Sequence, residues 1–292
     1  MSARILFVTG KGGTGKSCVA AALAREALRR GRPSLLMRMP SSSHATGDEG
    51  PAEEDRTAKR RRGVSEPEEK ILDERRDLES FLTRVLGLAF IARRLQDSST
   101  FSAVAAAAPG LRDLVALTAI TTEARRRRGV VVVDAPASGH SVPMLTAPSR
   151  VHDLAPFGPV AREAGAALAA LADPRRFAAV LVTTPEELAV TEIRMLHDQV
   201  ADAGVAACRV VVNGFWPAYV SKTDGDRIRR SKVSADAAMY IARHRRQLEL
   251  VDALEKTVGH CPRIAFSFRR QGAEAPEQDI AAVLDRLDED AA

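Results

Sequence analysis

Short apolar runs alternate with longer amphipathic stretches along most of the chain. Runs that end at a small or polar residue predict buried strands over residues 4–9, 33–37, 129–134, 177–183, 207–212 and 262–266. Apolar residues spaced three or four positions apart predict helices over residues 16–30, 184–204, 235–256 and 279–287. Strands that alternate with helices are typical of an α/β fold, so we expect a doubly wound, mostly parallel sheet covered on both faces.

The alternation is interrupted between residues 41 and 123. Residues 41–67 are rich in Ser, Gly, Glu, Asp and Arg and almost free of apolar side chains, so they bury too little surface to offset the entropy of ordering. We expect a mobile loop there. Residues 68–123 have helical spacing and no strand signal, which predicts a helical insertion beside the sheet. Residues 1–292 are otherwise predicted to form a single domain.

The composition is that of an ordinary soluble protein, with 45% hydrophobic and 28% charged residues and a net charge of +5. The three cysteines, Cys18, Cys208 and Cys261, form no CxxC pair, which argues against a disulfide framework or a zinc clip within one chain. The amino terminus lacks the features of a signal peptide, and no apolar run approaches the roughly 20 residues that span a bilayer. We therefore expect a cytoplasmic protein without membrane insertion.

A glycine-rich motif lies between the first predicted strand and the first predicted helix. Residues 10–17, GKGGTGKS, fit the phosphate-loop pattern GxxxxGK[ST]. The glycines allow successive backbone N–H groups to face one anion, and the following helix presents its positive end to that anion. Lys16 is expected to reach the β- and γ-phosphates. The predicted nucleotide contacts are Gly10, Lys11, Gly12, Gly13, Thr14, Gly15, Lys16, Ser17 and the next residue, Cys18.

The clearest strand pattern carries a second candidate ligand. Four consecutive valines lead to Asp134. A carboxylate at a strand tip beside a phosphate loop is a natural second anchor for Mg²⁺, usually through water. The predicted cofactors are therefore ATP and Mg²⁺, with the Ser17 hydroxyl and Asp134 as the metal site.

Lys11 gives the motif the form G-K-G-G-x-G-K-S, which resembles the deviant Walker A of partition, septum-placement, arsenite-pump and tail-anchored-protein-targeting ATPases and of nitrogenase iron protein. Residues 134–140, DAPASGH, are similar to the D-T-A-P-T-G-H switch of the arsenite-pump and tail-anchored-targeting branch. Further segments that resemble this branch are residues 108–114, 180–192, 210–213 and 262–266. The resemblance covers most of the chain outside residues 41–67 and is to the shorter bacterial members of this family.

The resemblance implies a nucleotide-switched dimeric P-loop ATPase and assigns roles to particular residues. Lys11 would reach across a dimer interface to the partner's nucleotide, and Lys16 would act on the phosphates within its own subunit. Asn213 would pair with the adenine edge, because an amide both donates and accepts. Pro262 and Phe266 would belong to a loop that covers the adenine.

The sequence departs from the family pattern in two places. Met39 stands where the family has an aspartate that positions the attacking water, and a methionine can neither orient water nor accept its proton. We therefore expect weak hydrolysis with nucleotide binding retained. The missing CxxC removes the zinc clip that joins two subunits in tail-anchored-targeting members.

Three functions stay open. The first is an ATPase switch that cycles between open and closed dimers. The second, favoured by Met39, is a non-hydrolysing nucleotide-binding regulatory subunit that partners an active paralogue. The third, a DNA-partition-type ATPase, rests only on basic runs at residues 59–62 and 125–128, which are more often solvated surface, so we expect no nucleic-acid partner. A homodimer and a heterodimer are both compatible with the sequence, which does not identify a client protein.

Overall fold

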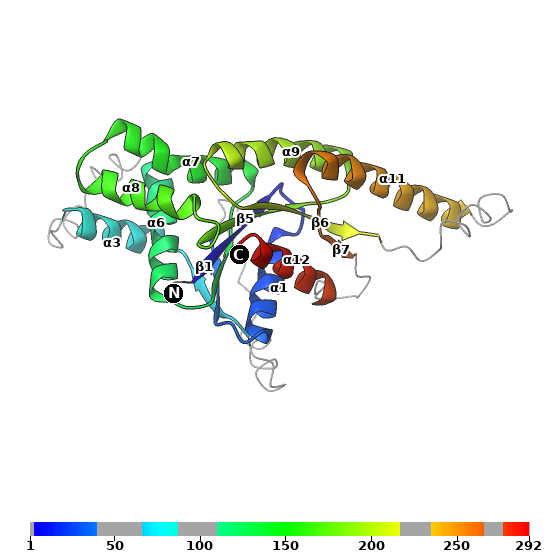
Figure 1. Ribbon diagram of the computed structural model, residues 1–292, viewed down its shortest axis with the longest axis horizontal. Coiled ribbons are helices and arrows are strands. Elements are labelled where there is room, and N and C mark those ends of the chain that lie inside the picture. Colours follow the sequence, from blue (N-terminus) through cyan, green and yellow to red (C-terminus); the bar gives the residue numbers. More distant parts are fainter. Residues whose placement is uncertain (1–2, 40–65, 87–109, 217–234, 266–276, 292) are drawn as a thin grey trace.

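A sheet of parallel strands forms the centre of the molecule (Figure 1). The computed structural model describes residues 3–39, 66–86, 110–216, 235–265 and 277–291. Within these ranges seven strands pair in the order β3-β2-β4-β1-β5-β6-β7, each parallel to its neighbours. They are β1 Arg4–Gly10, β2 Ser34–Arg38, β3 Glu68–Ile71, β4 Val130–Asp134, β5 Phe177–Thr183, β6 Cys208–Phe215 and β7 Arg263–Ala265. The predicted α/β class and all six predicted strands are confirmed.

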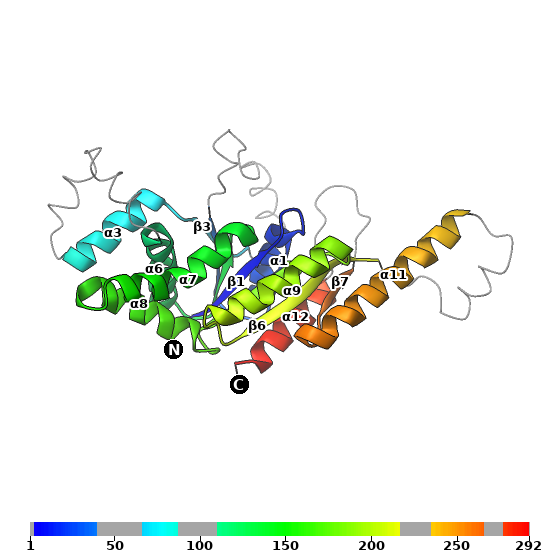
Figure 2. The same cartoon turned by 90° about the horizontal axis from the view of Figure 1, so that it is seen from above.

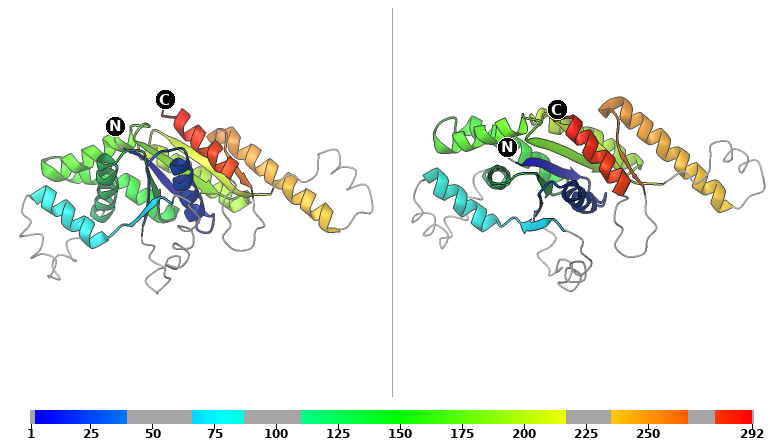
Figure 3. Two further views of the ribbon diagram at one scale, coloured as in Figure 1. Left: turned by 90° about the horizontal axis from the view of Figure 1, so that it is seen from below. Right: turned by 60° about the horizontal axis from the view of Figure 1, so that its bottom comes forward.

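Helices cover both faces of this sheet (Figures 1 and 3). One face carries α1 (Lys16–Arg29) and α12 (Glu277–Glu289), which pack against each other. The opposite face carries α6 Leu111–Arg126, α7 Ser138–Leu154, α8 Gly158–Leu171, α9 Glu187–Asp202 and α11 Ala235–Val258. Helix α3 (Glu74–Leu86) packs on α6, and the first half of α11 extends beyond the β7 edge of the sheet (Figure 2).

Alternate side chains of the central strands enter two separate hydrophobic cores. In β1, Ile5 and Phe7 belong to the core beneath α6, α7 and α9. Leu6 and Val8 belong to the core beneath α1 and α12. Burial on both faces explains why these strands appear in the sequence as unbroken apolar runs rather than as alternating patterns.

The expectation that residues 68–123 contain only helices is wrong at their start. Residues 68–71 form β3, the outermost strand beside β2, and α3 and α6 follow it. All four β3 residues are exposed and three are charged. Charged side chains are common on edge strands because they discourage pairing with another chain, so apolar periodicity does not detect such a strand. The expected mobile loop at residues 41–67 lies outside the described residues, apart from Glu66 and Pro67.

Helix α9 (Glu187–Asp202) begins later than its predicted start at residue 184. The Glu186 N–H donates to the Thr184 carbonyl at 2.8 Å, which closes a tight turn ahead of the helix. The capping position is Glu186, whose backbone is extended, and the first helical residue is Glu187. The proline at position 185 therefore lies in the turn and not in the first helical turn.

The carboxyl ends of β1, β2 and β4 meet at one edge of the sheet. Asp134 lies opposite Val8 in the register of β4 with β1 and opposite Arg38 in the register of β4 with β2. Ligands of open α/β sheets bind outside the carboxyl ends of the strands. Three strand ends, one of them continuous with residues 10–17, are thus brought to the place where a ligand is expected.

Ion pairs join the edge strand β3 to the end of α6. Arg127 donates hydrogen bonds of 2.6 and 2.8 Å to Glu68 and one of 2.7 Å to Glu123, which also accepts one of 2.7 Å from Lys70. The hydrogen bonds from Arg127 lower the pKa of Glu68. Burial alone would raise the pKa of Glu123, but its hydrogen bonds with Lys70 and Arg127 lower it.

We predict that Arg127→Ala lowers the free energy of unfolding by about 1 kcal/mol near neutral pH, the upper range for exposed ion pairs. The stabilisation by Glu68 and Glu123 is present above their unfolded pKa of about 4.3 and is lost as the pH falls through their lower folded values. Urea unfolding should therefore show the difference from wild type shrinking in acid. Arg128→Ala, an exposed neighbour, is the control, and an equal loss in that variant would contradict the prediction.

Candidate functional site

The glycine-rich motif occupies the predicted position, between the end of β1 at Gly10 and the start of α1 at Lys16. At two of its positions only glycine fits, because the backbone φ angle is positive and because a Cβ atom would collide with a neighbouring strand. Gly10 has φ +148° and a Cβ there would collide with the Val182 carbonyl, while Gly15 has φ +87° and a Cβ would collide with the Asn213 amide. The loop is therefore packed tightly against β5 and β6, which sets its curvature.

Lys16 folds back over the loop. Its Nζ donates to the Lys11 carbonyl at 3.0 Å, and the Thr14 hydroxyl donates to the same carbonyl at 2.9 Å. Burial lowers the pKa of Lys16, and the nearby Asp134 carboxylate opposes that shift. An ammonium group held over a glycine-rich loop at a helix amino terminus is suited to binding a polyphosphate.

Asp134 faces the start of α1 from the end of β4. Its side chain is only 12% exposed, and it is hydrogen-bonded to Ser17. Burial raises the pKa of Asp134, whereas the Ser17 hydrogen bond and the charges of Arg38 and Lys16 lower it. The two predicted metal ligands, Ser17 and Asp134, are thus brought together.

This oxygen pair suits Mg²⁺ in particular. Among the described residues, no three His, Cys, Asp or Glu side chains come close enough to hold a metal by themselves. Mg²⁺ in nucleotide sites is usually bound by one or two protein oxygens, with phosphates and water completing the octahedron. A hydroxyl and a carboxylate beside a phosphate loop match that need.

Lys11 points away from Lys16 and toward α9. Its Nζ forms an ion pair of 2.6 Å with Glu192, and the side chains are 39% and 45% exposed. Glu192 is the last residue of the segment 180–192 that resembles the family, and nothing in the sequence connected it with Lys11. The two residues are 181 positions apart, and only the placement of α9 beside the loop brings them together.

The remaining residues predicted to bind the nucleotide lie in different parts of the fold. Asn213, near the end of β6, donates through Nδ2 to the Thr14 carbonyl at 2.8 Å and so touches the phosphate loop directly. Pro262 is buried next to the same strand, where its carbonyl accepts from the Val212 N–H at 2.9 Å. Cys18 is exposed on the first turn of α1. Phe266 lies outside the described residues.

The segment after β4 is held to the phosphate-loop strand. The Ala135 N–H donates to the Val8 carbonyl at 3.0 Å, and the Thr9 hydroxyl donates to the Pro136 carbonyl at 2.8 Å. His140, in the first turn of α7, is exposed. These two hydrogen bonds join the end of β1 to the residues that lead into α7.

The end of β2 contributes a residue that sequence reasoning did not single out. Arg38 Nη1 lies 3.5 Å from Asp134 Oδ2, and Nη2 lies 3.4 Å from Glu69 Oε1. The next residue, Met39, is partly buried against the core, and its N–H donates to the Asp134 carbonyl at 3.3 Å. The one available signal for Arg38 was its position directly after the predicted strand at residues 33–37 and before Met39, where the family has its aspartate.

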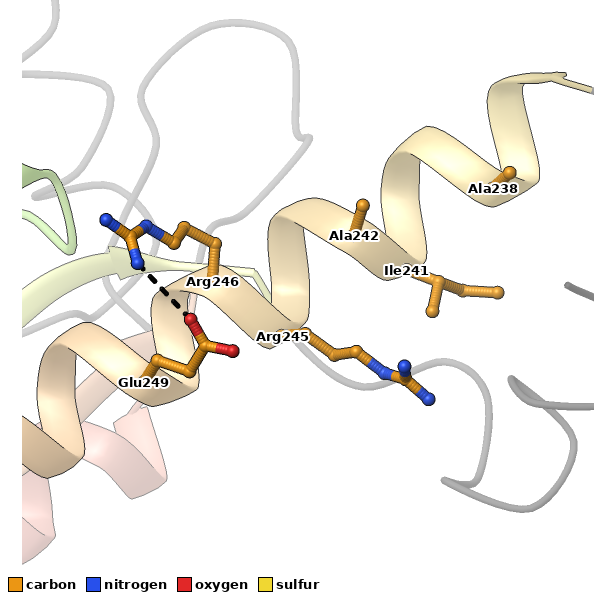
Figure 4. A pocket seen from close by; sticks show the side chains of 6 residues that line it. All are labelled: Ala238, Ile241, Ala242, Arg245, Arg246 and Glu249. Carbon is orange, nitrogen blue, oxygen red and sulfur yellow. Dashed lines mark hydrogen bonds and ion pairs between the residues drawn. The ribbon is translucent and has the colours of Figure 1, made fainter.

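A hollow of about 300 Å³ lies along α11, away from the phosphate loop (Figure 4). Arg246 and Glu249 point toward one another there, with an ion pair of 3.3 Å. The described lining residues are Ala238, Ile241, Ala242, Arg245, Arg246 and Glu249. These include no residue of the phosphate loop or of the strand ends beside it, so the strand-end edge remains the candidate site.

Part of the chain matches a known protein family, and nearly all of it aligns with known relatives. Residues 3–156, just over half of the chain, match the anion-transporting ATPase family. Similar relatives include ATPase BagA of Mycobacterium tuberculosis and a protein of Mycobacterium bovis whose name also describes an ATPase. Each is 29% identical, over 98% of this chain and 89% of the relative. None of the helices in the described ranges combines the length and apolar character that a membrane crossing requires.

Proposed function

Because the chain belongs to the anion-transporting ATPase family, we propose that it is a nucleotide-switched ATPase that binds Mg²⁺-ATP at residues 10–17 and acts as a dimer. The observation that carries the proposal is the meeting of Lys16, Ser17 and Asp134 at one edge of the sheet. These three groups supply a cation for the phosphates and two oxygens for a metal, in the arrangement that phosphoryl transfer requires.

In this proposal Lys16 leaves the Lys11 carbonyl and binds oxygens of the β- and γ-phosphates. Ser17 and Asp134 hold Mg²⁺, which neutralises charge that develops on those oxygens. The loop N–H groups and the α1 amino terminus bind the remaining negative charge. Asn213 pairs with the edge of adenine. Its amide oxygen and its second N–H remain available for this pairing, because the bond to the Thr14 carbonyl uses only one N–H.

The dimer is proposed from Lys11. Within one subunit Lys16 already lies over the loop, while Lys11 extends outward to Glu192. An exposed ion pair contributes only about 0–1 kcal/mol, so Lys11 can exchange Glu192 for a phosphate on a facing subunit at little cost. The facing subunit is either a second copy or a paralogue.

A second candidate is a regulatory subunit that holds nucleotide without hydrolysing it. The observation in its favour is Met39, which packs against the core and whose backbone N–H donates to the Asp134 carbonyl. General-base assistance needs a proton acceptor at or one water away from the attacking oxygen, and a thioether supplies none.

Nucleotide binding is the most direct test. We predict that Lys16→Ala reduces Mg²⁺-ADP and Mg²⁺-ATP affinity by at least about tenfold, because charge-assisted hydrogen bonds to phosphate are lost. Isothermal titration calorimetry measures this directly. Arg286→Ala, an exposed arginine on α12, serves as the control. Equal affinity in wild type and Lys16→Ala would refute the phosphate site.

Dimer closure can be tested with a matched pair of variants. We predict that Lys11→Ala leaves nucleotide affinity nearly unchanged but weakens ATP-dependent association, because the charge that would reach the facing subunit is missing. Glu192→Gln should release Lys11 without removing it and should retain association. Light scattering with ATP and with ADP, alone and with a candidate paralogue, measures the outcome. A monomer in every mixture would exclude the dimer.

Hydrolysis separates the two candidates. We predict slow turnover by the wild-type chain and an increase in Met39→Asp, because a carboxylate at the end of β2 can orient water. Phosphate release is the measurement, and Met39→Asn, a similar shape without a base, is the control. Rapid wild-type turnover would show that another group positions the water and would remove the case for a regulatory subunit.

A further inference from the structure

Arg38 lies between two carboxylates at the mouth of the candidate site. Its guanidinium is 3.5 Å from Asp134 and 3.4 Å from Glu69, so one fork spans the end of β4 and the edge strand β3. The Arg38 side chain is 32% exposed, compared with 12% for Asp134. The arginine is therefore more accessible to solvent than the carboxylate with which it pairs.

The register of the sheet places it there. β2 and β4 are neighbours, and Arg38 and Asp134 are paired residues in the ladder. Side chains of paired residues on parallel strands point to the same face. Their proximity is thus a property of the central sheet, and it does not depend on a loop conformation.

Asp134 needs compensation when no metal is present. A buried carboxylate is costly unless it is paired or hydrogen-bonded. The groups that meet it are the Ser17 hydroxyl, Lys16 and Arg38. Ser17 and Lys16 belong to the phosphate-loop motif and have roles toward the nucleotide, whereas Arg38 belongs to no part of that motif.

We infer that Arg38 is the counter-ion of Asp134 in the metal-free chain and that Mg²⁺ must compete with it for this carboxylate. The 3.5 Å separation from Asp134 is at the outer limit of a hydrogen bond, so the contact is weak enough to be displaced. Glu69 lets the guanidinium remain bound to β3 after it releases Asp134. Arg38 is a positioning residue. Its effect is to raise the Mg²⁺ concentration that half-saturates the nucleotide-bound protein.

This inference rests on the proposed Mg²⁺-nucleotide site, and the experiment separates the two. A fluorescent ADP analogue is bound to the full chain, first in a chelator and then with increasing Mg²⁺. We expect Arg38→Ala to lower the half-saturating Mg²⁺ concentration by about fivefold, the scale of one partly exposed ion pair. Affinity for the analogue in chelator should stay within about twofold, because Arg38 competes for the metal anchor and not for the phosphates. Arg286→Ala is the control for loss of a positive charge elsewhere.

A double-mutant cycle shows whether the effect passes through Asp134. In an Asp134→Asn background, Arg38→Ala should no longer change the Mg²⁺ requirement, because the shared carboxylate is gone. Arg38→Lys should fall between wild type and Arg38→Ala, since a shorter point charge pairs less well than a guanidinium fork. Arg38→Gln provides the same comparison if Arg38→Ala does not fold.

The outcomes are distinct. An unchanged or higher Mg²⁺ requirement in Arg38→Ala, with normal binding of the analogue, overturns the role of Arg38 and leaves the proposed function standing. The same shift in the Asp134→Asn background also overturns it, because the effect would then be a general change in charge. Failure of the wild-type chain to bind the analogue removes the nucleotide site and this inference together.

Discussion

A nearly buried carboxylate is the constraint around which the candidate site is arranged. Four buried valines bring Asp134 to the edge of the sheet, where only 12% of its side chain remains exposed. Such a charge must be compensated, and the compensating groups come from the phosphate loop and from the end of β2. The interactions of Asp134 with Ser17, Lys16 and Arg38 thus link the phosphate loop to the ends of β2 and β4.

The two lysines of the motif have different environments. Lys16 donates to a backbone carbonyl of the loop. Burial lowers the pKa of Lys16, and the charge of Asp134 opposes that shift. Lys11 is exposed and paired on the surface with Glu192. Removing an exposed lysine from its partner costs little free energy, whereas Lys16 lies over the loop. One short motif therefore supplies an inward cation and an outward one.

Much of this could be predicted from the sequence. The buried parallel strands appear as apolar runs because both of their faces are covered, and residues 10–17 were placed correctly between a strand and a helix. Pairing of Ser17 with Asp134 followed from the motif and the strand end. The edge strand β3 was missed because its charged residues face solvent, and the start of α9 was misplaced because a turn closes before the helix begins.

The sequence by itself thus determined the features that burial and local backbone chemistry write into consecutive residues: the fold class, the phosphate-loop motif and the strand end that carries Asp134. Only the tertiary structure decided which distant residues meet these features. Arg38 faces Asp134 across 96 positions, Glu192 holds Lys11 across 181, and Asn213 reaches the Thr14 carbonyl across 199. Those contacts depend on strand order, on register and on the placement of α9. These arise from packing of the whole domain, which no local pattern of residues specifies.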